Sequence, residues 1–241
     1  PPPPPPPPPS SLLPPPPTPP LYPYTTALPI SSLKRLCDLR AWCRQPLGQQ
    51  LTAAEQELLR DVLGDIFGYH LVQLDPACQS DSLAASRIVH RVVQSCTDQG
   101  LEQAPGLLGR AEALPLRSDS IDAFVLSHVL ELAQDAHQVL REIDRCLVAE
   151  GHLIVLGFNP YGWWGARKFL FGWRGNVPWS LRFVSLPRLK DWLSLLGFDT
   201  VRTRYLFPYP PWQYGAGSSK NRITLWQRLH RDSWPLLAAS Y

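Results

Sequence analysis

A strand–helix–strand pattern between residues 121 and 156 constrains the fold of this chain more than any other feature. Residues 121–126 and 152–156 are short apolar runs that predict two buried strands. Between them, Asp135 and Gln138 have the spacing of a helix N-cap, and the apolar residues that follow recur at helical spacing. Two strands joined by a helix form a βαβ unit, which gives parallel strands with a right-handed crossover.

The rest of the ordered sequence continues this alternation. A capping box at Thr52 and Glu55 predicts the start of a helix that runs to about residue 66. The other predicted elements are strands over 70–74 and within 86–93 (a stretch that also fits a helix), a helix over 185–196, and strands over 200–206 and 222–227. Strands alternating with helices predict an α/β fold with a doubly wound sheet.

The first 33 residues differ from the remainder in composition. Seventeen of the 28 prolines fall between positions 1 and 29, where no residue is charged. Such a tract favours extended polyproline conformations and has almost nothing with which to build a core. We therefore predict a disordered head over residues 1–33 and one domain over 34–241, the alternative being that the head is a docking ligand for a polyproline-binding module.

Charge and cysteine content narrow the class of protein. Residues 34–150 carry a net charge of −6 and residues 151–241 one of +9, and eight of the nine tryptophans lie in the basic part. No apolar run is long enough to cross a membrane as a helix. The five cysteines are odd in number and contain no C-x-x-C pair, so we predict reduced thiols, no metal site and a cytoplasmic location.

Three stretches carry a family resemblance. Residues 111–131, which read AEALPLRSDSIDAFVLSHVLE, are similar to a signature of the class I S-adenosylmethionine-dependent methyltransferases. In the type-11 group of that family the pattern is roughly A-x-x-L-P-F, a turn, F-D, a strand and H-x-L-E. Residues 139–153 and 191–198 resemble two later motifs of the same group, in the right order and spacing.

The resemblance implies a Rossmann-like methyltransferase fold with a seven-stranded, mostly parallel sheet and S-adenosylmethionine as cofactor. The strands at 70–74, 121–126 and 152–156 would be its first, fourth and fifth. The implied cofactor-binding residues follow the strands at their carboxyl ends, and they are Asp75, Arg110, Ala111, Glu112 and Ser127. His128, which in the family faces cofactor and substrate, is the predicted catalytic residue and would act as a general base near neutral pH.

The chain also departs from the family pattern. No glycine occurs in residues 75–79, where the family has a G-x-G-x-G loop, so this loop is degenerate. No acidic residue clearly marks the end of the second strand, and Arg110 stands where the family often has Asp. These departures support an alternative function, a catalytically inactive methyltransferase-like binding module.

The predicted acceptor side is a basic, aromatic insertion at about 158–184. Its tryptophans and arginines suit an anionic amphiphile, and Trp163, Trp164 and Arg167 are the predicted substrate-binding residues. The leading hypothesis is therefore methyl transfer to a small or amphiphilic acceptor, with peripheral membrane contact as a further hypothesis. No base-reading motif is present, so we predict no specific nucleic-acid partner.

Overall fold

The computed structural model describes residues 30–74, 81–95, 106–161, 165, 168–169, 180–204 and 236–240. The strands are β1 (His70–Leu74), β2 (His90–Ser95), β3 (Gly106–Leu108), β4 (Ile121–Ser127), β5 (Leu147–Leu156), β6 (Asp199–Arg204) and β7 (Leu236–Ser240). The helices are α1 (Ile30–Cys43), α2 (Pro46–Gly64), α3 (Val129–Leu132), α4 (Ala136–Cys146) and α6 (Leu186–Leu195), with a 3₁₀ turn, η2, at Asp81–Ala85.

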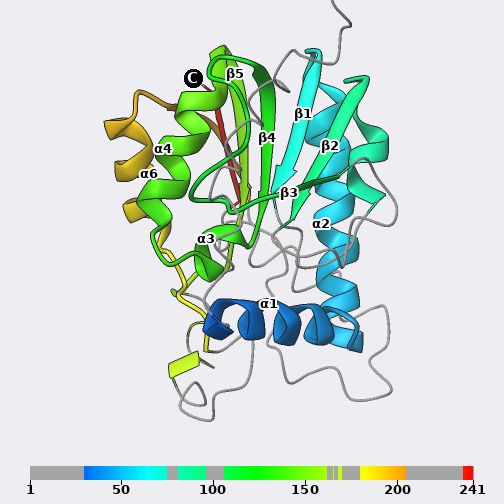
Figure 1. Cartoon of the computed structure of the whole chain (residues 1–241). Helices are drawn as coiled ribbons and strands as arrows, with labels where there is room; N and C mark the ends of the chain where they lie inside the picture. Colours follow the sequence, from blue (N-terminus) through cyan, green and yellow to red (C-terminus); the bar gives the residue numbers. More distant parts are fainter. Residues whose placement is uncertain are drawn as a thin grey trace, which may run out of the picture.

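The described strands form one seven-stranded sheet in the order β3-β2-β1-β4-β5-β7-β6 (Figure 1). The first five strands are parallel to one another, and β7 runs antiparallel to both β5 and β6. This confirms the predicted α/β fold with a mostly parallel sheet, and it confirms the predicted first, fourth and fifth strands. The order reverses between β1 and β4, and that point is where open α/β sheets bind ligands.

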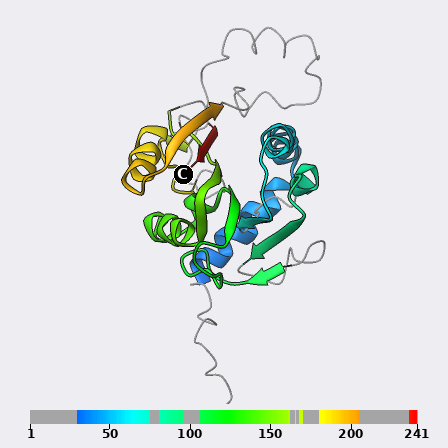
Figure 2. The same cartoon turned by 90° about the horizontal axis from the view of Figure 1, so that it is seen from above.

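Helices cover both faces of the sheet (Figures 1 and 2). On one face α4 and α6 pack against the strands through a core that includes Phe124, Leu140 and Leu193. On the other face α2 packs through a second core that includes Leu59 and Val125. The apolar faces that the sequence spacing predicts for these helices therefore place one helical layer on each face of the sheet.

The start of α2 corrects the predicted capping box. The helix begins at Pro46 with Gln45 as N-cap, so Thr52 and Glu55 lie inside it. The Thr52 hydroxyl donates to the Gly48 carbonyl at 2.9 Å instead of capping a free amide. A proline at the first turn is a helix start in its own right, because it has no amide that needs a partner.

Two strand predictions also shift. β5 begins at Leu147 and not at residue 152, with Glu150 in the left-handed region at φ 63° and a register shift in its pairing with β4. β2 occupies residues 90–95, later than the predicted stretch. The predicted strand at 222–227 lies outside the described residues, and β7 was not predicted.

Helix α1 lies across the carboxyl ends of the central strands (Figure 1). Its Leu36, Leu39 and Trp42 pack with Leu132 of α3 and with Phe158, which follows β5. The helix starts at Ile30, four residues before the predicted domain boundary at residue 34, and that boundary stays a prediction. Residues 1–29 lie outside the described residues.

The cysteines differ in state. Cys37 and Cys146 are free thiols, as predicted, whereas Cys43 at the end of α1 is disulfide-bonded. The prediction of reduced thiols is therefore wrong for Cys43. Within the described ranges, no helix has the length and hydropathy needed to cross a bilayer.

Candidate active site at the carboxyl edge of the sheet

Buried polar side chains collect where β1, β2 and β4 end. Gln73 near the end of β1 donates from Nε2 to the Ser127 hydroxyl at the end of β4, over 3.3 Å. On β2, Gln94 and Ser95 are fully buried, and Arg40 of α1 donates to the Ser95 hydroxyl at 3.2 Å. Polar groups in a dry location are kept where they are hydrogen-bonded or serve a ligand. This edge is therefore the candidate site.

His128 follows β4 directly and is the centre of the site. Its backbone is left-handed, with φ 60°, which is uncommon for a residue other than glycine. Its amide donates to the Leu156 carbonyl at 3.0 Å, which fixes it beside the end of β5. The imidazole stacks on the Phe158 ring with centroids 4.2 Å apart. Strained backbone held this firmly is typical of functional positions.

Two buried carboxylates face the two nitrogens of the His128 ring. Nε2 lies 2.9 Å from Glu55 Oε1, and Nδ1 lies 3.6 Å from Glu131 Oε1. Glu131 Oε1 also accepts the amide of Phe158 at 2.7 Å. Gly157 leaves room for this carboxylate, since a Cβ there would lie 2.8 Å from Oε1. The His128 imidazole thus links Glu55 of α2, Glu131 of α3 and Phe158 in the segment that follows β5.

The carboxylates determine the charge of His128. Burial alone lowers the pKa of the imidazole, but the charges and hydrogen bonds of Glu55 and Glu131 raise it from 6.5 to about 10. At neutral pH the ring is protonated and can donate a proton but not accept one. His128 remains the predicted catalytic residue, but this environment disfavours the general-base role.

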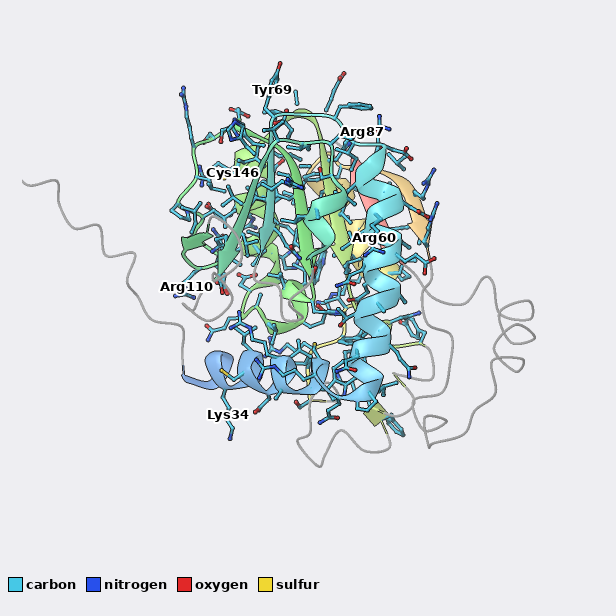
Figure 3. The ribbon with its side chains drawn as sticks, turned by 90° about the vertical axis from the view of Figure 1, so that its right-hand side faces the viewer. Lys34, Arg60, Tyr69, Arg87, Arg110 and Cys146 are labelled. Atoms are coloured by element: carbon cyan, nitrogen blue, oxygen red, sulfur yellow. The ribbon has the colours of Figure 1, made fainter. Side chains whose placement is uncertain are left out.

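The predicted cofactor-binding residues after β3 form a separate turn at the same edge. The Arg110 and Ala113 backbones pair across it, and Ala111 packs partly buried against the core. The Glu112 carboxylate lies 3.5 Å from Arg110 Nε and accepts the Gln134 amide at 3.3 Å, which ties this turn to the segment after α3. Figure 3 shows Arg110 near the end of the molecule where α1 lies.

Four predicted residues are not placed by the structure. Asp75, Trp163, Trp164 and Arg167 lie outside the described residues, so their roles stay predictions. In the described part of the chain no group of three His, Cys, Asp or Glu side chains could hold a metal ion. Of the predicted set, the structure brings Ser127 and His128 together and places the 110–112 turn at the same edge.

Comparison with known proteins agrees with this geometry. A family model described as a methyltransferase domain matches residues 56–155. The chain is 31% identical over 181 residues to YafS of Escherichia coli (strain K12), covering 75% of this chain and 73% of YafS. It is 31% identical over 144 residues to the ubiquinone/menaquinone biosynthesis C-methyltransferase UbiE of Rubrivivax gelatinosus, covering 49% of this chain and 57% of UbiE.

A solved structure extends the similarity to the fold. An S-adenosylmethionine-dependent methyltransferase from Thermotoga maritima, a possible histamine N-methyltransferase, superposes with a TM-score of 0.57 at 20% identity. The match covers 76% of this chain and 86% of the other. The chain belongs to the class I S-adenosylmethionine-dependent methyltransferases. The family model, the UbiE relative and the shared fold together confirm the predicted family and its cofactor, S-adenosylmethionine.

The described residues fit the cofactor of this methyltransferase family. Gln94 is fully buried, and neither its Nε2 nor its Oε1 has a partner in the described part of the chain. An unpaired buried amide is costly, so its presence here indicates a ligand with its own donors and acceptors, as a nucleoside has. Gln94, Glu112 and Ser127 are the described residues that would hold S-adenosylmethionine.

Four residues that the structure places in the methyltransferase site are not predicted as site residues from the sequence. Glu55 was assigned to a helix cap, although its spacing from Leu51 and Leu58 places it on the buried stripe of α2, where a carboxylate is unusual. Glu131 is the last residue of the 111–131 motif, but the resemblance implies no role for its side chain. Gln73 and Gln94 gave no signal beyond being polar residues at the ends of apolar strands.

Proposed function

We propose that this methyltransferase transfers the methyl group of S-adenosylmethionine to a small or amphiphilic acceptor. The observation that carries the proposal is the apolar cluster beside the polar site. Leu36, Leu39 and Trp42 of α1 pack on Phe158, and Phe158 stacks on His128. An acceptor that lay beside His128 would meet apolar and aromatic side chains along the rest of its length.

In this proposal the side chains of the site divide between cofactor and acceptor. When bound, S-adenosylmethionine supplies an electrophilic methyl group. Ser127 and Gln94 bind the cofactor, while Phe158 and the protonated His128 orient the acceptor. Positioning of this kind supplies most of the rate when the reaction needs little acid–base help. Helix α1 excludes water from the edge.

The similarity to UbiE supports an amphiphilic acceptor, because the name of that relative describes a quinone-biosynthesis C-methyltransferase. The predicted substrate-binding residues Trp163, Trp164 and Arg167 and the peripheral membrane contact belong to the same proposal. Described neighbours of that segment are aromatic and basic too, since Tyr161 and Phe169 are exposed and Lys168 lies 4.4 Å over the Phe183 ring.

A cytoplasmic location is also proposed. The free thiols of Cys37 and Cys146 agree with this location, whereas the disulfide at Cys43 does not.

The test is a series of acceptors that share one reactive group and differ in apolar length. Phenol and 4-alkylphenols of increasing chain length are incubated with the full chain and S-adenosylmethionine, and formation of S-adenosylhomocysteine is measured. We expect kcat/KM to rise with chain length by about threefold to fourfold for each buried methylene, up to the length of the site. Leu39→Ala should flatten this dependence, while Leu195→Ala, at an exposed position of α6, should leave it unchanged. Turnover that does not depend on chain length would contradict the amphiphilic acceptor.

A further inference from the structure

The Glu131 carboxylate is buried with one of its two oxygens unused. Its side chain is 2% exposed, and Oε1 serves both the Phe158 amide and His128. Oε2 is buried and has no hydrogen-bond partner in the part of the chain that the structure describes. A buried carboxylate oxygen normally accepts at least one hydrogen bond, because losing its hydration without compensation is costly.

The charges around Glu131 do not balance locally. Glu55 and Glu131 contribute two carboxylates, and His128 contributes one imidazolium between them. Lys168 is close enough to interact electrostatically with Glu131. Its ammonium group, however, donates to the Leu181 carbonyl and lies over the Phe183 ring, so it is not a direct partner of Oε2.

The position of Glu131 Oε2 also indicates a ligand. Glu131 lies in α3, directly after β4, and it contacts the amide that follows the end of β5. The carboxyl ends of adjacent strands at a switch point are where ligands bind in open α/β sheets. While Oε1 holds the Phe158 amide, the unpaired Oε2 at such an edge is therefore placed to meet a ligand.

We propose that Glu131 Oε2 binds a positively charged group of a ligand at the edge between β4 and β5. Two sources carry that chemistry: the sulfonium of the methyl donor and the ammonium group of an amine acceptor. The inference rests on the proposed function, because it concerns the same site. It adds only that the site prefers a ligand with a positive charge. A bound cation would complete the charge balance of the Glu55–His128–Glu131 cluster.

The donor arm compares S-adenosylmethionine, which is a cation at sulfur, with the neutral thioether S-adenosylhomocysteine. Both are titrated calorimetrically into the full-length protein. If the sulfonium is the partner, the wild type prefers S-adenosylmethionine, and Glu131→Gln lowers that preference by about tenfold. The glutamine keeps an oxygen for the Phe158 amide and removes only the charge. Glu57→Gln, an exposed position on α2, makes the same charge change and should keep the preference.

The acceptor arm uses octylamine and octanol, which differ in charge but share an alkyl chain. Tryptophan fluorescence measures their binding to the same proteins near pH 7, where the amine is protonated. If an ammonium is the partner, the wild type prefers octylamine, and Glu131→Gln loses this preference while its donor preference stays unchanged. Glu131→Asp, which retains the charge, should retain part of the selectivity in whichever arm shows it.

The outcomes separate this inference from the proposed function. If the wild type prefers the cation in neither arm, or if Glu131→Gln changes neither preference while its melting temperature stays near the wild-type value, the inference is overturned. The titrations of the wild type can overturn the inference by themselves, so a Glu131→Gln protein that misfolds does not prevent the test. If neither cofactor form binds, the proposed function fails, and a preference for octylamine would still support the cation site.

Discussion

The two edges of the sheet differ in where their polar and apolar side chains lie. At the carboxyl edge, Glu55, His128 and Glu131 are buried, and apolar residues of α1 cover them. At the opposite edge, Phe67, Tyr69 and Val89 are 68%, 76% and 79% exposed. Figure 3 shows Tyr69 and Arg87 at one end of the molecule and α1 at the other.

The edges also differ in how well their polar groups are paired. At the amino edge, one oxygen of Asp122 accepts the amides of Tyr69 and His70 at 3.0 and 2.8 Å. At the carboxyl edge, Gln94 and Glu131 keep unpartnered atoms within the described structure. The difference indicates that the amino edge is built for stability, while the carboxyl edge retains costly groups for a ligand.

The largest expected effect comes from breaking the buried cluster. Glu55→Ala leaves the imidazolium of His128 with one carboxylate and a cavity beside it. We expect the free energy of unfolding to fall by about 3 kcal/mol, as when one partner of a buried ion pair is removed. Urea denaturation measures this, with Glu57→Ala as the exposed control that should change stability by less than about 0.5 kcal/mol. Equal effects of the two substitutions would contradict the buried pairing.

A smaller effect is the pH dependence of the same cluster. The pKa of His128 is raised in the folded protein, so its contribution is fully present below the unfolded value of 6.5 and is lost as pH rises through about 10. The stability difference between the wild type and His128→Gln should therefore shrink steadily between these two pH values. Thermal melting of both proteins across that range tests the sign, and a difference that grows with pH would refute it.

The smallest effect is expected at the amino edge. Asp122→Ala removes the acceptor of two backbone amides, which should cost about 1–2 kcal/mol of stability. Because this edge lies away from the site, the affinity for S-adenosylhomocysteine should not change. Calorimetry of the variant measures both quantities, and a weakened cofactor affinity would show that the two edges are coupled.

Much of the fold follows from local sequence patterns. The strands β1 and β4 are short apolar runs, and the helices α4 and α6 have apolar residues at helical spacing. Asp135 caps α4 by accepting the amides of His137 and Gln138, as its spacing predicts. The predicted start of α2 was too late, because Thr52 and Glu55 have the spacing of a capping box only by coincidence and the helix begins at Pro46. β7 was missed because its pairing with β5 joins segments far apart in the chain.

For the site, the sequence determined which residues end the strands and hence that Ser127 and His128 lie at the ligand edge. It also determined the family, because the motifs at 111–131 and 139–153 are local and ordered. Only the tertiary structure decided the charge of His128. Glu55 is 73 residues away in sequence, and it reaches the imidazole because α2 packs on the sheet with that face inward. Burial then removes the water that would otherwise screen these charges, so the fold and not the motif sets the protonation of the ring.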